Sequence, residues 1–162
     1  MTRIEEKIGN LLRRAGITIS VAESCTGGFV AHRITNVSGS SDYFESGIVT
    51  YSDNAKAELL GIARLLIDQH GAVSEPVVGK MAEGIRDKRK TTLGLATTGV
   101  AGPSGGTPET PVGTVFIALA SPVETVVRRF HFTGKRIEIK RLAAEKALEM
   151  VLEYSESHGT KA

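Results

Sequence analysis

Two segments of the chain hold the residue types with which a protein could do chemistry. The first, residues 23–28, reads Glu-Ser-Cys-Thr-Gly-Gly and lies between an expected strand and an expected helix. Ser24 is a candidate nucleophile there, because free N–H groups and the positive dipole end at a helix N-terminus favour an oxyanion or a phosphate. Cys25 is the other possible nucleophile, or else a small buried hydrophobe. The same six residues would also serve as a tight turn with capping hydroxyls.

The second segment is the long loop Thr-Thr-Gly-Val-Ala-Gly-Pro-Ser-Gly-Gly-Thr-Pro at residues 97–108. Its four glycines would let backbone N–H groups approach a ligand closely, as they do in phosphate-binding nests. Its prolines indicate a shaped loop, although a flexible connection is the alternative interpretation. Shaped loops of this length in compact domains are usually functional, which favours a binding role here.

A serine nucleophile needs a base, and no histidine stands near Ser24 in the sequence. The four histidines of the chain are scattered without metal-ligand spacing, so we expect no metal site. A lysine can act as the base if burial lowers its pKa far enough. Lys56, expected at the start of a short helix after a strand that ends at Tyr51, is the candidate. The sequence around Lys56 is equally typical of an ordinary surface lysine.

Strands and helices alternate along the chain and predict the fold that must position these residues. Helices on both faces of a sheet are expected from this order, and only two residues separate the last two strands, which predicts an antiparallel hairpin. The fold class is therefore α/β, a three-layer α/β/α sandwich with a mixed sheet that ends in an antiparallel hairpin. Strands are expected at 17–21, 44–51, 93–98, 112–120 and 123–132, with helices at 29–36, 74–88 and 135–154, before Gly16 and before Gly61.

Length and composition indicate a single globular domain over residues 1–162, with residues 155–162 as a frayed tail. A net charge of +2, no tryptophan and 5% aromatic residues argue against a nucleic-acid partner. The basic clusters at 86–90 and 135–141 are interpreted as solvated helix faces. A single cysteine, a charged N-terminal stretch and the lack of a long apolar run predict a cytoplasmic protein that does not bind a membrane.

Several motifs in order resemble one known family. They are residues 22–28, Tyr51-Ser52 with Lys56, and residues 71–75, 98–103, 111–115 and 134–136. Together they resemble the C-terminal domain of the competence/damage-inducible protein CinA, a family that includes stand-alone nicotinamide-nucleotide amidases. The likeness covers nearly the whole chain. One departure is Ser104, which stands where the family often has glycine.

The resemblance implies hydrolysis of the carboxamide of nicotinamide mononucleotide to nicotinic acid mononucleotide and ammonia, without a cofactor. It implies Ser24 as nucleophile, Lys56 as base, and Tyr51 as a residue that relays or positions the proton. The backbone N–H groups of residues 25–28 would stabilise the oxyanion, the 99–106 loop would hold ribose and phosphate, and Arg136 would supply phosphate charge. The expected substrate-binding residues are Cys25, Thr26, Gly27, Gly28, Thr98, Gly99, Gly102, Ser104, Gly105 and Arg136.

Two other function classes stay open on the sequence. A nucleotide-binding regulatory module would need the glycine-rich loops and a cation for phosphate, but no lysine of low pKa. A serine esterase or peptidase would need a pocket for an acyl chain or an extended peptide, which the glycine-rich, aromatic-poor loops fit less well. The expected partners are a pyridine mononucleotide and a second copy of the chain, because small sandwiches with an exposed hairpin often pair.

Overall fold

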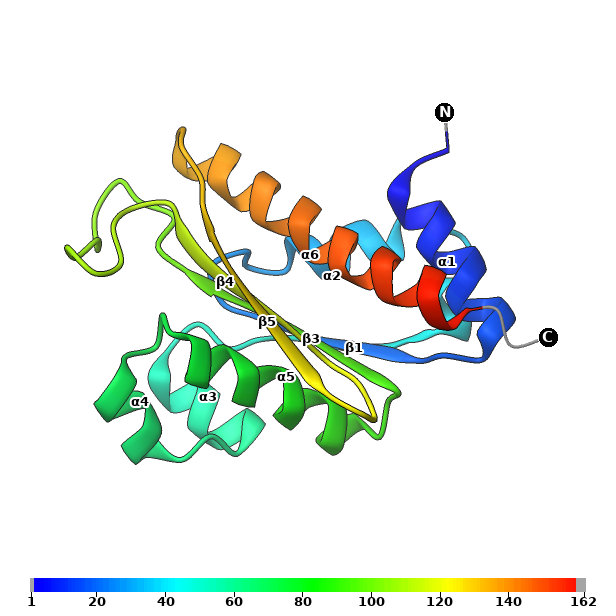
Figure 1. Ribbon diagram of the computed structural model, residues 1–162, viewed down its shortest axis with the longest axis horizontal. Coiled ribbons are helices and arrows are strands. Elements are labelled where there is room, and N and C mark those ends of the chain that lie inside the picture. The colour runs from blue at the N-terminus through cyan, green and yellow to red at the C-terminus, as the bar shows by residue number, and fades with distance from the viewer. Residues whose placement is uncertain (1, 160–162) are drawn as a thin grey trace.

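A computed structural model describes residues 2–159 and shows one five-stranded sheet between two layers of helices (Figure 1). The strand order is β2-β1-β3-β4-β5. The first three strands in the sequence pair in parallel, β4 is antiparallel to β3, and β5 is antiparallel to β4. This confirms the mixed sheet with its terminal hairpin. The strands are β1 (Ile19–Glu23), β2 (Phe44–Val49), β3 (Leu93–Gly99), β4 (Thr114–Ala120) and β5 (Thr125–His131).

Helices cover both faces of the sheet, as the predicted three-layer sandwich requires (Figure 1). One layer holds α1 (Ile4–Ala15), α2 (Phe29–Thr35) and α6 (Arg136–His158), and the other holds α3 (Asp53–Leu60), α4 (Arg64–His70) and α5 (Glu75–Arg89). A short 3₁₀ helix, η1 (Ser40–Asp42), precedes β2. Within residues 2–159, no helix combines the length and the apolar character needed to cross a membrane.

The interior strand β1, between β2 and β3, is buried along its whole length and contributes side chains to two cores. Val21 packs into the core beneath α1 and α6, whereas Ala22 packs into the core beneath α5. Successive side chains of a strand point to opposite faces, so one strand can supply both cores. The carboxyl end of β1 therefore emerges from a fully packed region, which restrains the loop that follows it.

Three chain segments meet at the carboxyl edge of the parallel strands. In the register of β1 and β3, Glu23 lies opposite Thr97, and the Ser24 N–H donates to the Thr97 carbonyl over 3.0 Å. On the other side, the Thr50 N–H donates to the Glu23 carbonyl over 2.8 Å. The loops after β1, β2 and β3 are thereby brought together, as expected for sites in open α/β sheets.

The structure corrects parts of the expected element map. Helix α6 continues to His158, and the buried Ser155 hydroxyl donates to the Val151 carbonyl, so a frayed tail from residue 155 is wrong for residues 155–158. Residues 160–162 of that predicted tail lie outside the described residues. Helix α4 was not predicted from the sequence, and its N-cap residue, Ala63, makes no side-chain capping hydrogen bond. Without a capping side chain, the local sequence carries little signal for a helix start.

Helix α5 packs so closely on β3 that one glycine is required there. A Cβ atom on Gly94 would lie 2.1 Å from the Ala82 carbonyl oxygen. We predict that Gly94→Ala lowers the free energy of unfolding by about 2 kcal/mol or more, because backbone must move. Gly79→Ala is the matched control: its Cβ would meet Val127 at an ordinary 3.7 Å.

Because alanine favours a helix more than glycine does, the control variant should gain about 0.5–1 kcal/mol. Urea unfolding of both variants measures these changes. Equal effects of the two substitutions would contradict this account of the α5–β3 contact.

Candidate active site

Ser24 and Lys56, which lie 32 residues apart in the chain, meet in the structure. The Lys56 Nζ and Ser24 Oγ atoms are 3.1 Å apart, and the lysine side chain is buried, with 1% of its surface exposed. The same Nζ donates to the Thr50 carbonyl over 2.8 Å and to the Tyr51 carbonyl over 3.5 Å. Among the described residues, no carboxylate lies within 4.0 Å of it.

The local sequence explains why Lys56 points to this place. Ser52 caps α3, its hydroxyl accepting the Ala55 N–H over 3.1 Å, and Gly61 ends the helix in the left-handed conformation (φ +72°). Lys56 thus lies in the first turn of a short, well-defined helix. Side chains of a helix tilt toward its N-terminus, so Lys56 extends back toward the end of β2.

Burial lowers the pKa of Lys56, because the charged ammonium is poorly solvated there. Asp53 and Cys25 act in the opposite direction but do not outweigh burial. A neutral amine has two N–H donors and one lone pair. With the Thr50 and Tyr51 carbonyls as acceptors for its N–H groups, its lone pair is left for the hydroxyl proton of Ser24. This arrangement suits a general base.

Cys25, the alternative nucleophile, is unsuited to that role. Burial and the nearby Glu23 raise the pKa of its thiol to about 12. At neutral pH the sulfur is therefore protonated, and the reactive thiolate is scarce. Cys25 instead lines the pocket beside Ser24.

Glu23 has a structural role in the site that was not predicted from the sequence. Its carboxylate is buried and accepts the N–H groups of Gly28 (3.1 Å), Val30 (3.1 Å) and Ala31 (2.9 Å), together with the Thr26 hydroxyl. A carboxylate at a helix N-terminus is stabilised by the unpaired N–H groups and the dipole. The sequence signal that could have indicated this role is an acidic residue directly before the turn.

The expected set of backbone oxyanion donors, the N–H groups of residues 25–28, is smaller in the structure. The Gly28 N–H is bound by Glu23, and the Gly27 N–H donates to the Ser24 carbonyl over 3.0 Å, so neither is free. Among the described residues, no acceptor pairs with the N–H groups of Cys25 and Thr26. Two of the four expected backbone donors thus remain available beside the Ser24 hydroxyl.

A pocket of about 240 Å³ opens between the glycine-rich loop and the start of α6, and Cys25, the residue that follows Ser24, lines it. Its lining residues are Cys25, Tyr51, Val73, Gly99, Val100, Ala101, Gly102, Ser104, Gly105 and Arg136. Most of the residues expected to bind substrate are therefore brought together. Thr26, Gly27, Gly28 and Thr98 are the exceptions, since none of them lines the pocket. The Thr26 hydroxyl donates to Glu23, and the buried Thr98 hydroxyl donates to the Ala72 carbonyl over 2.9 Å. Both hydroxyls already have protein partners.

Arg136 joins the two sides of this pocket. Its guanidinium donates to the Tyr51 hydroxyl over 2.8 Å and to the Gly102 carbonyl over 2.9 Å. The Tyr51 side chain is 60% exposed, and only its backbone carbonyl faces Lys56. The structure therefore places the Tyr51 hydroxyl on Arg136 and not on the Ser24–Lys56 pair.

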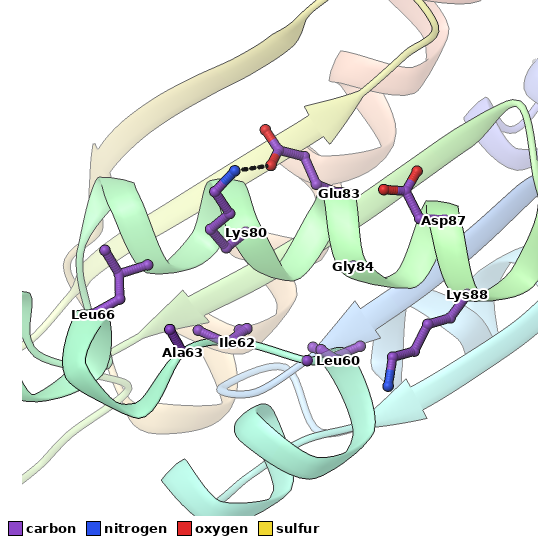
Figure 2. Close-up of a pocket in the computed structure, with 10 residues that line it drawn as sticks. Leu60, Ile62, Ala63, Leu66, Lys80, Glu83, Gly84, Asp87 and Lys88 are labelled. Atoms are coloured by element: carbon purple, nitrogen blue, oxygen red, sulfur yellow. Dashed lines mark hydrogen bonds and ion pairs between the residues drawn. The ribbon is translucent and has the colours of Figure 1, made fainter.

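Figure 2 shows a second hollow, of about 490 Å³, between the α3–α4 connection and α5. No serine, threonine or cysteine lines it, and its Lys80 and Glu83 pair with each other. Within residues 2–159, no group of three or more His, Cys, Asp or Glu side chains is placed to hold a metal ion. The Ser24 pocket is thus the candidate active site.

The fold and the pocket define the class of protein: an open α/β sheet with a serine–lysine contact and a glycine-rich loop at its carboxyl edge. Residues 1–155 match the family model described as the CinA C-terminal domain, and the chain belongs to this family. Its relatives include a CinA-like protein of Syntrophus aciditrophicus, 51% identical over 93% of this chain and 36% of the relative. A putative competence-damage inducible protein of Caldanaerobacter subterraneus is 46% identical over 94% of this chain and 37% of the relative.

The chain thus spans little more than a third of the length of these curated relatives. Solved structures align over nearly their whole length. A CinA superfamily protein from Klebsiella pneumoniae has a TM-score of 0.91 at 30% identity, covering 95% of this chain and 96% of that one. A competence/damage inducible protein from Agrobacterium tumefaciens has a TM-score of 0.88 at 33% identity, covering 94% of this chain and 98% of that one. These names state no reaction.

The lowered pKa of Lys56 predicts a pH-dependent stability. Between this lowered value and the ordinary value of 10.5, the unfolded chain binds more protons at this residue than the folded chain. Stability therefore rises with pH across this window. We expect Lys56→Met to lose this contribution, so that the melting temperature of wild type minus that of the variant increases as the pH is raised toward 10.5. Scanning calorimetry tests this, and parallel pH profiles of the two proteins would contradict it.

Proposed function

We propose that this chain hydrolyses the carboxamide of nicotinamide mononucleotide to nicotinic acid mononucleotide and ammonia, with Ser24 as nucleophile and Lys56 as base. One observation carries the proposal: a buried lysine without a carboxylate partner, its Nζ 3.1 Å from the Oγ of a serine beside a pocket. Burying a lysine costs free energy. At this position burial also lowers the pKa of the lysine, which is what a general base needs.

The first half of the reaction forms an acyl-enzyme. The Ser24 Oγ attacks the carboxamide carbon while Lys56 accepts the hydroxyl proton, and the electron pair of the carbonyl moves to oxygen. The N–H groups of Cys25 and Thr26 stabilise this oxyanion. The tetrahedral intermediate then collapses, the carbon–nitrogen bond breaks, and the Lys56 ammonium returns its proton to the departing nitrogen as ammonia.

The second half of the reaction regenerates the enzyme. A water molecule attacks the acyl carbon and gives its proton to the neutral Lys56. When the second tetrahedral intermediate collapses, the ester bond to Ser24 breaks and the Ser24 oxygen takes that proton back. The products are the free hydroxyl and nicotinic acid mononucleotide, so one water is consumed for each ammonia released.

The pocket supports a small polar substrate over the alternatives. A volume of about 240 Å³ with a glycine-rich wall suits a compact ligand better than an acyl chain or an extended peptide. A nucleotide-binding module without activity would have no use for a buried lysine of lowered pKa at the nucleophile. The resemblance of the motifs to those of nicotinamide-nucleotide amidases supports the particular substrate.

Ammonia release from nicotinamide mononucleotide, with EDTA present, tests the proposal directly. We expect activity in the wild type and a loss of roughly 10³-fold or more in kcat for Ser24→Ala and for Lys56→Ala, because the two residues act as one unit. Melting temperatures and nucleotide binding of both variants check that they fold. A folded wild type that binds the nucleotide but releases no ammonia would favour the binding module.

Tyr51→Phe separates two roles for this residue. If the hydroxyl only holds Arg136, its removal should raise KM about three- to tenfold and change kcat little, because one hydrogen bond to a cation at the pocket rim is lost. Steady-state kinetics with nicotinamide mononucleotide measures the split. A large fall in kcat at unchanged KM would instead assign Tyr51 to proton transfer.

A further inference from the structure

Lys140, one helical turn beyond Arg136 on α6, is a cation without a partner beside the active site. It is half-buried, and among the described residues neither a carboxylate within 4.0 Å nor a hydrogen-bond acceptor pairs with it. The Lys140 Nζ lies over Gly27, since a Cβ atom built on Gly27 would be 3.3 Å from this nitrogen. The ammonium group thus rests on the turn that carries the candidate nucleophile.

Arg136 and Lys140 face the same side of α6, since residues four apart on a helix are neighbours. Their situations differ. Arg136 already donates to Tyr51 and to Gly102, whereas Lys140 has no such commitment. The charge of Lys140 also reaches the site, where it opposes the rise in the pKa of the Cys25 thiol. The nearby carboxylate of Glu23 accepts backbone N–H groups at the N-terminus of α2.

We infer that Lys140 recognises the phosphate of the substrate, an inference that rests on the proposed function. A phosphate monoester carries about −1.5 to −2 charges at neutral pH, and a lysine binds it as a point charge. An unpaired ammonium over the Gly27 turn can do so without breaking an existing ion pair. With the carboxamide at Ser24, the phosphate lies toward α6, between Lys140 and the remaining N–H groups of Arg136. The site therefore selects a mononucleotide over its nucleoside.

Helical periodicity separates Lys140 from its basic neighbours. Lys135 and Arg141 are exposed, whereas the side chain of Lys140 is half-buried against the turn at Gly27. Arg141 is thus a matched control, adjacent on the helix and of the same charge. The variants for comparison are Lys140→Gln, Lys140→Arg and Arg141→Gln.

Steady-state hydrolysis of nicotinamide mononucleotide and of nicotinamide riboside tests the inference. Lys140→Gln should raise KM for the mononucleotide about tenfold or more, because a charged contact to phosphate is lost. The riboside lacks the phosphate, so its kcat/KM should stay within about twofold of wild type. Lys140→Arg should restore most of the mononucleotide affinity, and Arg141→Gln should match wild type. A mononucleotide KM for Lys140→Gln equal to that of Arg141→Gln would overturn the inference.

Calorimetric titration with nicotinic acid mononucleotide keeps this test independent of turnover. If the wild type binds the mononucleotide without hydrolysing it, the amidase proposal fails, and a weaker affinity of Lys140→Gln than of Arg141→Gln still supports the role of Lys140. If the wild type hydrolyses the substrate and Lys140→Gln binds as tightly as Arg141→Gln, only the inference about Lys140 fails. A wild type that binds no mononucleotide would overturn both.

Discussion

The contact between the Glu23 carboxylate and the N-terminus of α2 holds the whole site together. The side chain of Glu23 fixes the turn that presents Ser24. Its backbone carbonyl accepts the Thr50 N–H, and the Thr50 carbonyl in turn accepts from Lys56. One residue at the end of a fully buried strand thus sets the position of both Ser24 and Lys56. A carboxylate is suited to this task, because it accepts several N–H groups at once and complements the helix dipole.

The two buried ionisable groups, Glu23 and Lys56, have different surroundings. Glu23 is surrounded by donors, which stabilise its charge and keep it away from the reacting atoms. Lys56 has only carbonyls and the Ser24 hydroxyl around it, so burial dominates and lowers its pKa. An ion pair between them would hold a proton on the lysine and remove its use as a base. Separate anchoring of the carboxylate is therefore a condition for the proposed role of Lys56 as a base.

Local signals predicted much of the fold and part of the site. The helix expected from residue 74, the antiparallel hairpin and the alternation of strands with helices follow from short-range preferences, and the structure contains all three. The expected two-residue hairpin connection was wrong, because β5 begins at Thr125 and residues 121–124 join the two strands. The contact of Ser24 with Lys56 was suggested by the family resemblance, since no local pattern of Lys56 predicts its burial. The tertiary partners of Glu23 and Thr98 could not be predicted from the sequence, because they depend on how α2 and the segment before α5 pack against the sheet.

The glycines of the first loop serve a different purpose from the one expected of them. Gly27 and Gly28 adopt positive φ angles of +59° and +95°, and their N–H groups are bound within the protein. What the missing side chain at Gly27 provides is room, since the Lys140 ammonium lies where a larger residue would extend. A glycine-rich turn beside a helix is commonly associated with anion binding by backbone N–H groups. Here a carboxylate of the protein accepts the N–H groups at the start of α2. Positive charge near the site comes from side chains of α6, with Arg136 lining the pocket and Lys140 lying over Gly27.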